Sequence, residues 1–123
     1  MPMIDIYAAV GTFADTKKLA TDAATLVKSV EQVPDIPMFR ENTAAFVHEM
    51  PLTALSNVDG DGTYVRVQVL TNAGAFDRQK ELTLVEKLTE LIAAAGWGLW
   101  GHAQTNDELV AAARAEIGRL RPG

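Results

Sequence analysis

Residues 4–19 read IDIYAAVGTFADTKKL and residues 67–82 read VQVLTNAGAFDRQKEL, and these two stretches decide the fold. Each begins with alternating residues, the period of a half-buried strand, and continues past a glycine into a helical pattern. Glycine, phenylalanine, lysine and leucine recur between them at an offset of 63 residues. We therefore predict an internal duplication, with pseudo-repeats at about 2–62 and 63–105.

The first half is expected to form a strand, a helix and a second strand. The strands are predicted at residues 4–8 and 42–50, and the helix at about 15–30. Two parallel strands joined by a helix are the natural unit for this order. The predicted core face of the helix follows its apolar spacing and consists of Leu19, Ala23, Leu26 and Val30.

The second half begins with a strand at 65–69 and a helix that ends near residue 95, with a predicted core face of Leu82, Val85, Leu88 and Ile92. Gly96 then passes straight into Trp97, where the first half has a linker and a second strand. Either the chain lacks that strand or residues are missing from the sequence. We favour the omission, because an unpaired sheet edge would otherwise remain. A capping box at 105–108 predicts a last helix over about 106–120.

Composition excludes several classes of function. The chain of 123 residues is the size of one domain, 1–123, and its net charge of −5 argues against a partner nucleic acid. The absence of cysteine removes thiol chemistry and thiolate metal sites. The two histidines, His48 and His102, show no ligand spacing, so we expect no metal and no other cofactor. Without a signal peptide or an apolar run of ~20 residues, the chain is expected to be soluble and cytoplasmic, with no membrane partner.

Three features together resemble the tautomerase superfamily: Pro2 at the start of a strand, two β-α-β halves, and the segment 97–101, WGLWG. The resemblance is to fused two-unit relatives of 4-oxalocrotonate tautomerase and covers about residues 2–106. It implies an α/β fold in which tandem β-α-β units form a four-stranded sheet with two helices on one face. The helix at 106–120 would be an added C-terminal element. It also implies a homotrimer.

In this family the initiator methionine is removed and the exposed proline amine performs the chemistry, which here assigns catalysis to Pro2. An α-amino group has a pKa near ~8, and burial in an apolar pocket lowers that pKa. A secondary amine poised near neutrality can take a proton from one atom of a substrate and return it to another. The alternative is that Pro2 is simply a strand-start proline.

The resemblance fails at the arginines that hold substrate carboxylates. The matching positions are Thr12 and Ala44 in the first half and Asn72 and Ala75 in the second. A bidentate guanidinium is the usual way to hold a carboxylate, so dehalogenase and decarboxylase activities become less favoured.

Other residues are candidates for substrate binding. Trp97 matches the aromatic residue that lines the family's pocket, although core or interface packing would explain it equally. Asn72 could donate to a substrate oxygen or be a turn residue. Arg66 is predicted to point away from the helix-covered face, where it either reaches a carboxylate in a trimer or pairs with Asp5. The pairing is the favoured alternative.

Three further side chains are candidates with ordinary alternatives. Arg40 could reach an adjacent subunit's pocket or be a solvated charge. His102 follows the aromatic segment and could line the pocket. His48 is more readily explained as a hydrogen-bonded structural histidine than as an acid.

The sequence thus predicts a cofactor-free tautomerase that uses Pro2 as a general base on a small 2-hydroxyalkenoate or α-keto acid. One alternative is a hydratase, dehalogenase or decarboxylase of the same superfamily, with protonated Pro2 as a general acid. The other is a trimeric interaction protein that keeps the fold without chemistry.

Overall fold

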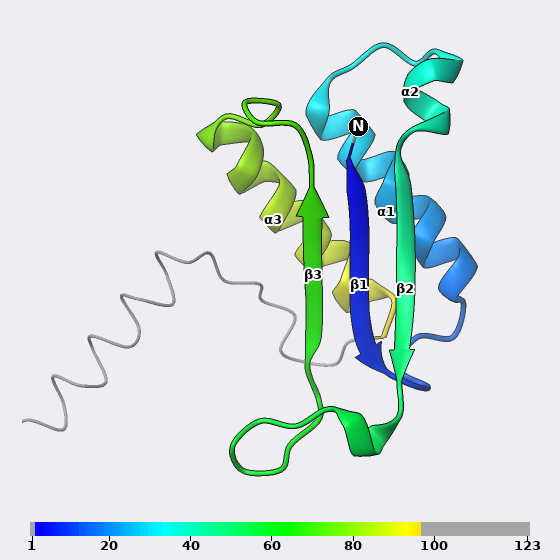
Figure 1. Ribbon diagram of the computed structural model, residues 1–123, viewed down its shortest axis with the longest axis vertical. Coiled ribbons are helices and arrows are strands. Elements are labelled where there is room, and N and C mark those ends of the chain that lie inside the picture. The colour runs from blue at the N-terminus through cyan, green and yellow to red at the C-terminus, as the bar shows by residue number, and fades with distance from the viewer. Residues whose placement is uncertain (1, 97–123) are drawn as a thin grey trace, which may run out of the picture.

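A computed structural model describes residues 2–96 of the chain (Figure 1). In chain order the elements are β1 (Met3–Ala9), α1 (Thr16–Glu31), α2 (Pro37–Glu41), β2 (Ala44–Met50), a 3₁₀ turn η1 (Leu52–Ala54), β3 (Val65–Leu70) and α3 (Arg78–Ala94). Every strand and long helix predicted within these residues is present. The boundaries that were predicted agree with the observed ones to within two residues, and α3, for which no start was predicted, begins at Arg78.

The three strands form one mixed sheet in the order β2-β1-β3. β1 pairs in parallel with β2, as the β-α-β interpretation of the first half predicted, and antiparallel with β3. Ile6 in the middle of β1 lies between Val47 and Val67. β1 is therefore the central strand of the described sheet, and β3 lies beside it at one edge.

The two long helices cover one face of this sheet, and among residues 2–96 neither α1 nor α3 covers the other, which is called the open face below (Figure 1). Their apolar sides pack on the even-numbered residues of β1, of which Ile4 and Ile6 have no exposed surface. The core is continuous across the helices and the sheet, and its buried helical residues include Leu19, Val27, Leu88 and Ile92. An α/β fold with helices on one face of the sheet is confirmed.

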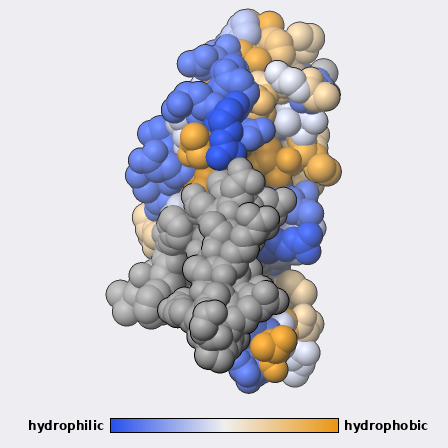
Figure 2. Space-filling view, turned by 90° about the vertical axis from the view of Figure 1, so that its left-hand side faces the viewer, coloured by the Kyte–Doolittle hydropathy of each residue, from blue (hydrophilic) through white to orange (hydrophobic). Residues whose placement is uncertain are grey.

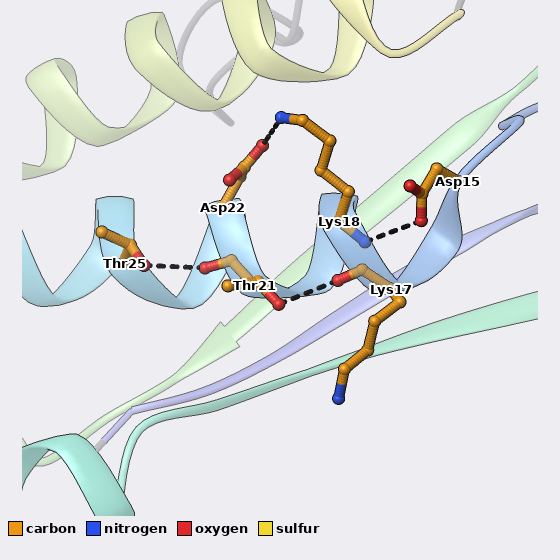
Figure 3. Close-up of polar contacts among 6 residues, drawn as sticks. All are labelled: Asp15, Lys17, Lys18, Thr21, Asp22 and Thr25. Atoms are coloured by element: carbon orange, nitrogen blue, oxygen red, sulfur yellow. Dashed lines mark hydrogen bonds and ion pairs between the residues drawn. The ribbon is translucent and has the colours of Figure 1, made fainter.

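Both long helices begin at an aspartate that caps the first turn. Asp15 accepts a hydrogen bond from the backbone N–H of Lys18 at 3.0 Å, and Asp77 accepts one from Lys80 at 2.8 Å. Such a side chain satisfies one of the helix's unpaired N–H groups. Figure 3 shows the Asp15 cap with the outer surface of α1, where Lys18 and Asp22 form an exposed ion pair of 2.6 Å. The two similar stretches, 4–19 and 67–82, thus lead into helices that begin with the same kind of cap.

The predicted core face of α3 is partly wrong. Leu82 is 39% exposed, and the buried residues are Leu84, Leu88 and Ile92. Leu88 and Ile92 belong to both the predicted and the buried set. The prediction therefore fails in the first turns of α3, where Leu84 rather than Leu82 is buried. In α1 the prediction holds for Leu19, Ala23 and Val30, whereas Val27 is buried and Leu26 only partly so.

Two short elements were not predicted. α2 begins with Pro37, at a position where a missing N–H is harmless. η1 follows β2 directly. No helix within residues 2–96 is long and apolar enough to cross a membrane. The segment 97–101, the helix predicted at 106–120 and any strand joined to them lie outside the described residues.

Candidate functional site

The predicted catalytic residue lies at the head of the central strand. The side chain of Pro2 is fully buried, and its carbonyl oxygen accepts a hydrogen bond from the backbone N–H of Ala44 at 3.3 Å. The parallel pairing of β1 with β2 thus begins at this residue. Because the sheet order places β1 in the middle, Pro2 is flanked on both sides.

β3 ends and α3 begins at the same end of the sheet as Pro2 (Figure 1). Leu70 opposes Met3 in the antiparallel register, so Thr71 and Asn72 follow β3 beside the start of β1. Lys80, in the first turn of α3, donates from Nζ to the carbonyl oxygen of Glu31 at 3.2 Å. That carbonyl belongs to the last turn of α1, where the helix dipole favours a cation.

Asn72 is the predicted binding residue that lies at this end of the sheet from β3. It is exposed, and its carbonyl oxygen accepts a hydrogen bond from the N–H of Ala75 at 3.1 Å. Its backbone therefore builds the turn before α3, which agrees with the turn interpretation. Within residues 2–96 its side-chain amide makes no hydrogen bond, so the same residue can also serve as a donor.

Arg66 points away from the helix-covered face, as predicted, but its predicted pairing with Asp5 is wrong. Its guanidinium lies 5.8 Å from the centre of the Tyr7 ring, a cation–π distance. Asp5 instead lies opposite Gln68 in the register. Arg66 opposes Tyr7, which is five residues along β1 from Pro2, or roughly 17 Å at ~3.4 Å per residue. A single chain therefore does not bring Arg66 to Pro2.

The carboxylate of Asp5 is hydrogen-bonded to His48. Nε2 of His48 lies 2.7 Å from Oδ1 of Asp5, and the imidazole stacks on the Tyr7 ring with centroids 4.4 Å apart and planes 11° apart. These contacts join β1 to β2 across the open face. His48 is thus a hydrogen-bonded histidine of the sheet, as the structural interpretation predicted.

Arg40 lies in α2 and is held by Asp35. Its Nη1 is 2.8 Å from Asp35 Oδ1, and Lys28 Nζ is 2.9 Å from the same oxygen. Hydrogen bonds from Lys28 and Arg40 lower the pKa of Asp35 to about 2. These residues line one end of a groove of about 440 Å³ between α1 and β2, which Lys17 lines further along the helix. In the described structure Arg40 is therefore an ion-paired surface residue beside the start of β2.

Besides Asp5, Tyr7 and His48, the open face of the sheet carries apolar residues. Phe46 and Leu70 are 48% and 66% exposed, and Met3 lies on the same face. In Figure 2, hydrophilic residues dominate the upper left, whereas the right-hand side is mixed, with hydrophobic residues in its upper part and a hydrophilic patch at mid-height. An exposed apolar sheet face of this kind is typical of an interaction surface.

Two residues at the Pro2 end were not singled out from the sequence. Lys80 is a cation at that end of the sheet. The sequence pointed to it, because it matches Lys17 at the offset of 63 residues. Thr71 carries a hydroxyl that is buried and has no hydrogen-bond partner among residues 2–96. A single threonine after a strand has no pattern that could identify it. The remaining predicted residues, Trp97 and His102, lie outside the described part of the chain.

Comparisons with family models, with curated proteins and with solved structures found no match to this chain. Within the described residues, no group of three or more histidine, aspartate or glutamate side chains is arranged to hold a metal ion.

Proposed function

We propose that the protein is a cofactor-free tautomerase in which the amine of Pro2, freed by removal of Met1, moves a proton between oxygen and carbon of a small 2-hydroxyalkenoate or α-keto acid. The observation that carries this proposal is the position of Pro2, buried at the head of the central strand. Burial disfavours the cationic form of an amine, so the pKa of this amine would fall from its ordinary value near ~8 toward neutrality.

The reaction needs one group that both accepts and returns a proton. The nitrogen lone pair of Pro2 takes the proton of the substrate enol, the C–O bond becomes a carbonyl, and the ammonium returns the proton to the distal alkene carbon. Asn72 would donate to the substrate oxygens. Lys80, which lies at the same end of the fold, would supply the positive charge that arginines supply in the resembling family.

The finer architecture belongs to the same proposal. A fourth strand and the C-terminal helix would come from residues beyond Gly96, with Trp97 as the wall of the pocket. The open face, with its exposed Phe46 and Leu70, would be covered by two further copies in a trimer. Arg66 and Arg40 would then act, if at all, in the site of a neighbouring subunit, because neither lies free beside Pro2 in its own chain.

The test is the ultraviolet-monitored ketonisation of phenylenolpyruvate or 2-hydroxymuconate, after intact mass has established the state of Met1. We expect a rate well above buffer that falls by about 100-fold or more in Pro2→Ala, the usual contribution of a general base. Pro51→Ala is the matched control, because Pro51 is an exposed proline next to η1 and should leave the rate unchanged. Retained Met1, or equal rates for Pro2→Ala and the parent protein, would overturn the proposal.

A second candidate function is an interaction protein of the same fold without chemistry. The open sheet face favours it, because Phe46 and Leu70 remain exposed on that face in the single chain. Sedimentation of the protein and of its Leu70→Asp variant separates the two functions when it is combined with the enol assay. Assembly that Leu70→Asp abolishes, together with no turnover, would support the interaction protein.

A further inference from the structure

β2 lies at one edge of the described sheet, and some of its backbone groups face away from β1. The N–H of Ala44 and the carbonyl oxygen of Met50 bond to the two residues that flank β1. Successive residues of a strand direct their backbone groups to opposite sides, so the residues with outward N–H and C=O groups are Ala45, Val47 and Glu49. Among the described strands only β1 pairs with β2, and an unpaired edge of this kind is a template for a further strand.

The groove of about 440 Å³ between α1 and β2 lies along this edge. In Figure 1 the first turns of α1 extend past the outer edge of β2, so the helix overhangs the space in which a further strand would lie. The helix side of the groove includes the short side chains of Ala20 and Ala24, and the strand side is formed by Thr43 and Ala45. Ala45 is one of the residues with outward backbone groups. The groove therefore gives an extended chain access to the edge of β2.

The groove carries positive charge although the net charge of the chain is −5. Its charged lining residues are Lys17 toward one end and Lys28, Arg40 and Asp35 toward the other. Asp35 pairs with both Lys28 and Arg40, so one carboxylate faces two cations. Lys17 makes no ion pair within the described chain, and Figure 3 shows its side chain leaving α1 on the side opposite to that of Lys18. An occupant with a negative charge at each end would complement this arrangement.

The spacing of these charges fits a short extended segment. Lys17 and Lys28 are eleven residues apart in α1, which is about 17 Å at ~1.5 Å per residue. Five residues of an extended strand cover the same length at ~3.4 Å per residue. Alternate side chains of a strand share a face, so acidic side chains at its first and fifth positions would both face the groove.

We propose that the groove between α1 and β2 binds an extended acidic segment of a partner protein, which adds a strand to β2. In this mode of recognition, main-chain hydrogen bonds to the edge strand supply affinity, and side chains that enter the groove supply specificity. Lys17 binds one terminal carboxylate of the segment, and Lys28 with Arg40 binds the other. The site is independent of the proposed chemistry, because Pro2 bonds to the opposite side of β2.

The charge requirement is tested with a fluorescently labelled, C-terminally amidated peptide, Glu-Val-Ala-Val-Glu, whose binding is followed by fluorescence anisotropy at low ionic strength. We expect saturable binding, and binding at least about tenfold weaker for Lys-Val-Ala-Val-Lys. Lys17→Gln should weaken binding of the acidic peptide about threefold, as expected for one exposed ion pair. Lys18→Gln is the matched control, because it removes the same charge from the other side of α1 and should leave the affinity unchanged.

Pairing with the strand edge is tested separately. Methyl groups on the two valine nitrogens of the peptide remove one alternate set of donors, and methyl groups on the nitrogens of alanine and the second glutamate remove the other. Only one set faces β2, so one pattern should weaken binding at least about fivefold and the other should be tolerated. In the protein, Glu49→Pro removes an outward N–H and keeps the ladder to β1, so it should weaken binding, whereas Glu49→Gln should not.

Three results would overturn the proposal. The first is the absence of saturable binding of the acidic peptide, or equal binding of the acidic and basic peptides. The second is an equal effect of the two methylation patterns, which would show that side chains alone make the contact. The third is slow hydrogen exchange of the outward amides in the protein alone, because the edge would then already be paired, with a second copy or with residues outside 2–96. Those amides belong to Ala45, Val47 and Glu49.

Discussion

Replacing Ile6 by alanine tests the arrangement of the sheet most directly. Ile6 has no exposed surface and lies in the central strand, between Val47 and Val67. Removing its outer carbons under two helices leaves a cavity that strands on both sides cannot close. Such substitutions cost 2–5 kcal/mol, and we expect about 3–4 kcal/mol here because the site is central. Ile6→Val, which removes one carbon, should cost about 1 kcal/mol.

The assay is equilibrium denaturation in urea, with Met3→Ala as the matched control in the same strand. Met3 is 37% exposed and points to the open face, so its truncation should cost less than half as much as Ile6→Ala. At about 4 °C per kcal/mol, Ile6→Ala should also lower the melting temperature by about 14 °C. A cost for Met3→Ala equal to or above that of Ile6→Ala would refute the register, because a slip of one residue exchanges the two faces of a strand.

Two further predictions concern charge and backbone conformation. Asp35 has a pKa lowered to about 2 by Lys28 and Arg40, so its ionised form stabilises the fold above the ordinary pKa of 3.8. That stabilisation should be lost as pH falls from 3.8 toward 2, and the difference in urea midpoint between the parent protein and Asp35→Asn should shrink over the same interval. Gly96 has a φ of +125°, and a Cβ there would lie 2.7 Å from the carbonyl oxygen of Thr12. Gly96→Ala should therefore cost more than Gly74→Ala, where φ is also positive but the space is open; equal urea midpoints for the two variants would contradict this.

The strands and the fold class could be predicted because their signals are local. Period-two alternation in β1 and β3 directly reports which residues face the core. The face of α3 could not be predicted as well, because leucines at 82, 84 and 88 offer two overlapping stripes in the sequence. Only the packing of α3 against α1 and the sheet selects Leu84 over Leu82. Tertiary contacts, rather than the helical period, decide such cases.

The candidate site was less predictable than the fold. Pro2 was found because its position at a strand start is visible in the sequence. The predicted partner of Asp5 was wrong. Arg66 and His48 both lie on strands beside β1, and only the directions of their side chains decide which of them contacts Asp5. Thr71 and Lys80 can be recognised as residues near Pro2 only once the strand register and the helix ends are known. Their roles depend on distances across the fold, which no local pattern encodes.

The order of strands in the sheet has a consequence for synthesis of the chain. β1 leaves the ribosome first among the described elements, yet its antiparallel partner, β3, is complete only at Leu70. At about 5–20 residues per second, the intervening stretch takes several seconds to make. β1, the central strand of the folded protein, is therefore made first and stays without its antiparallel partner until β3 has been synthesised. Slowing translation ahead of residue 70 should prolong this exposure, and the yield of folded protein should fall with it.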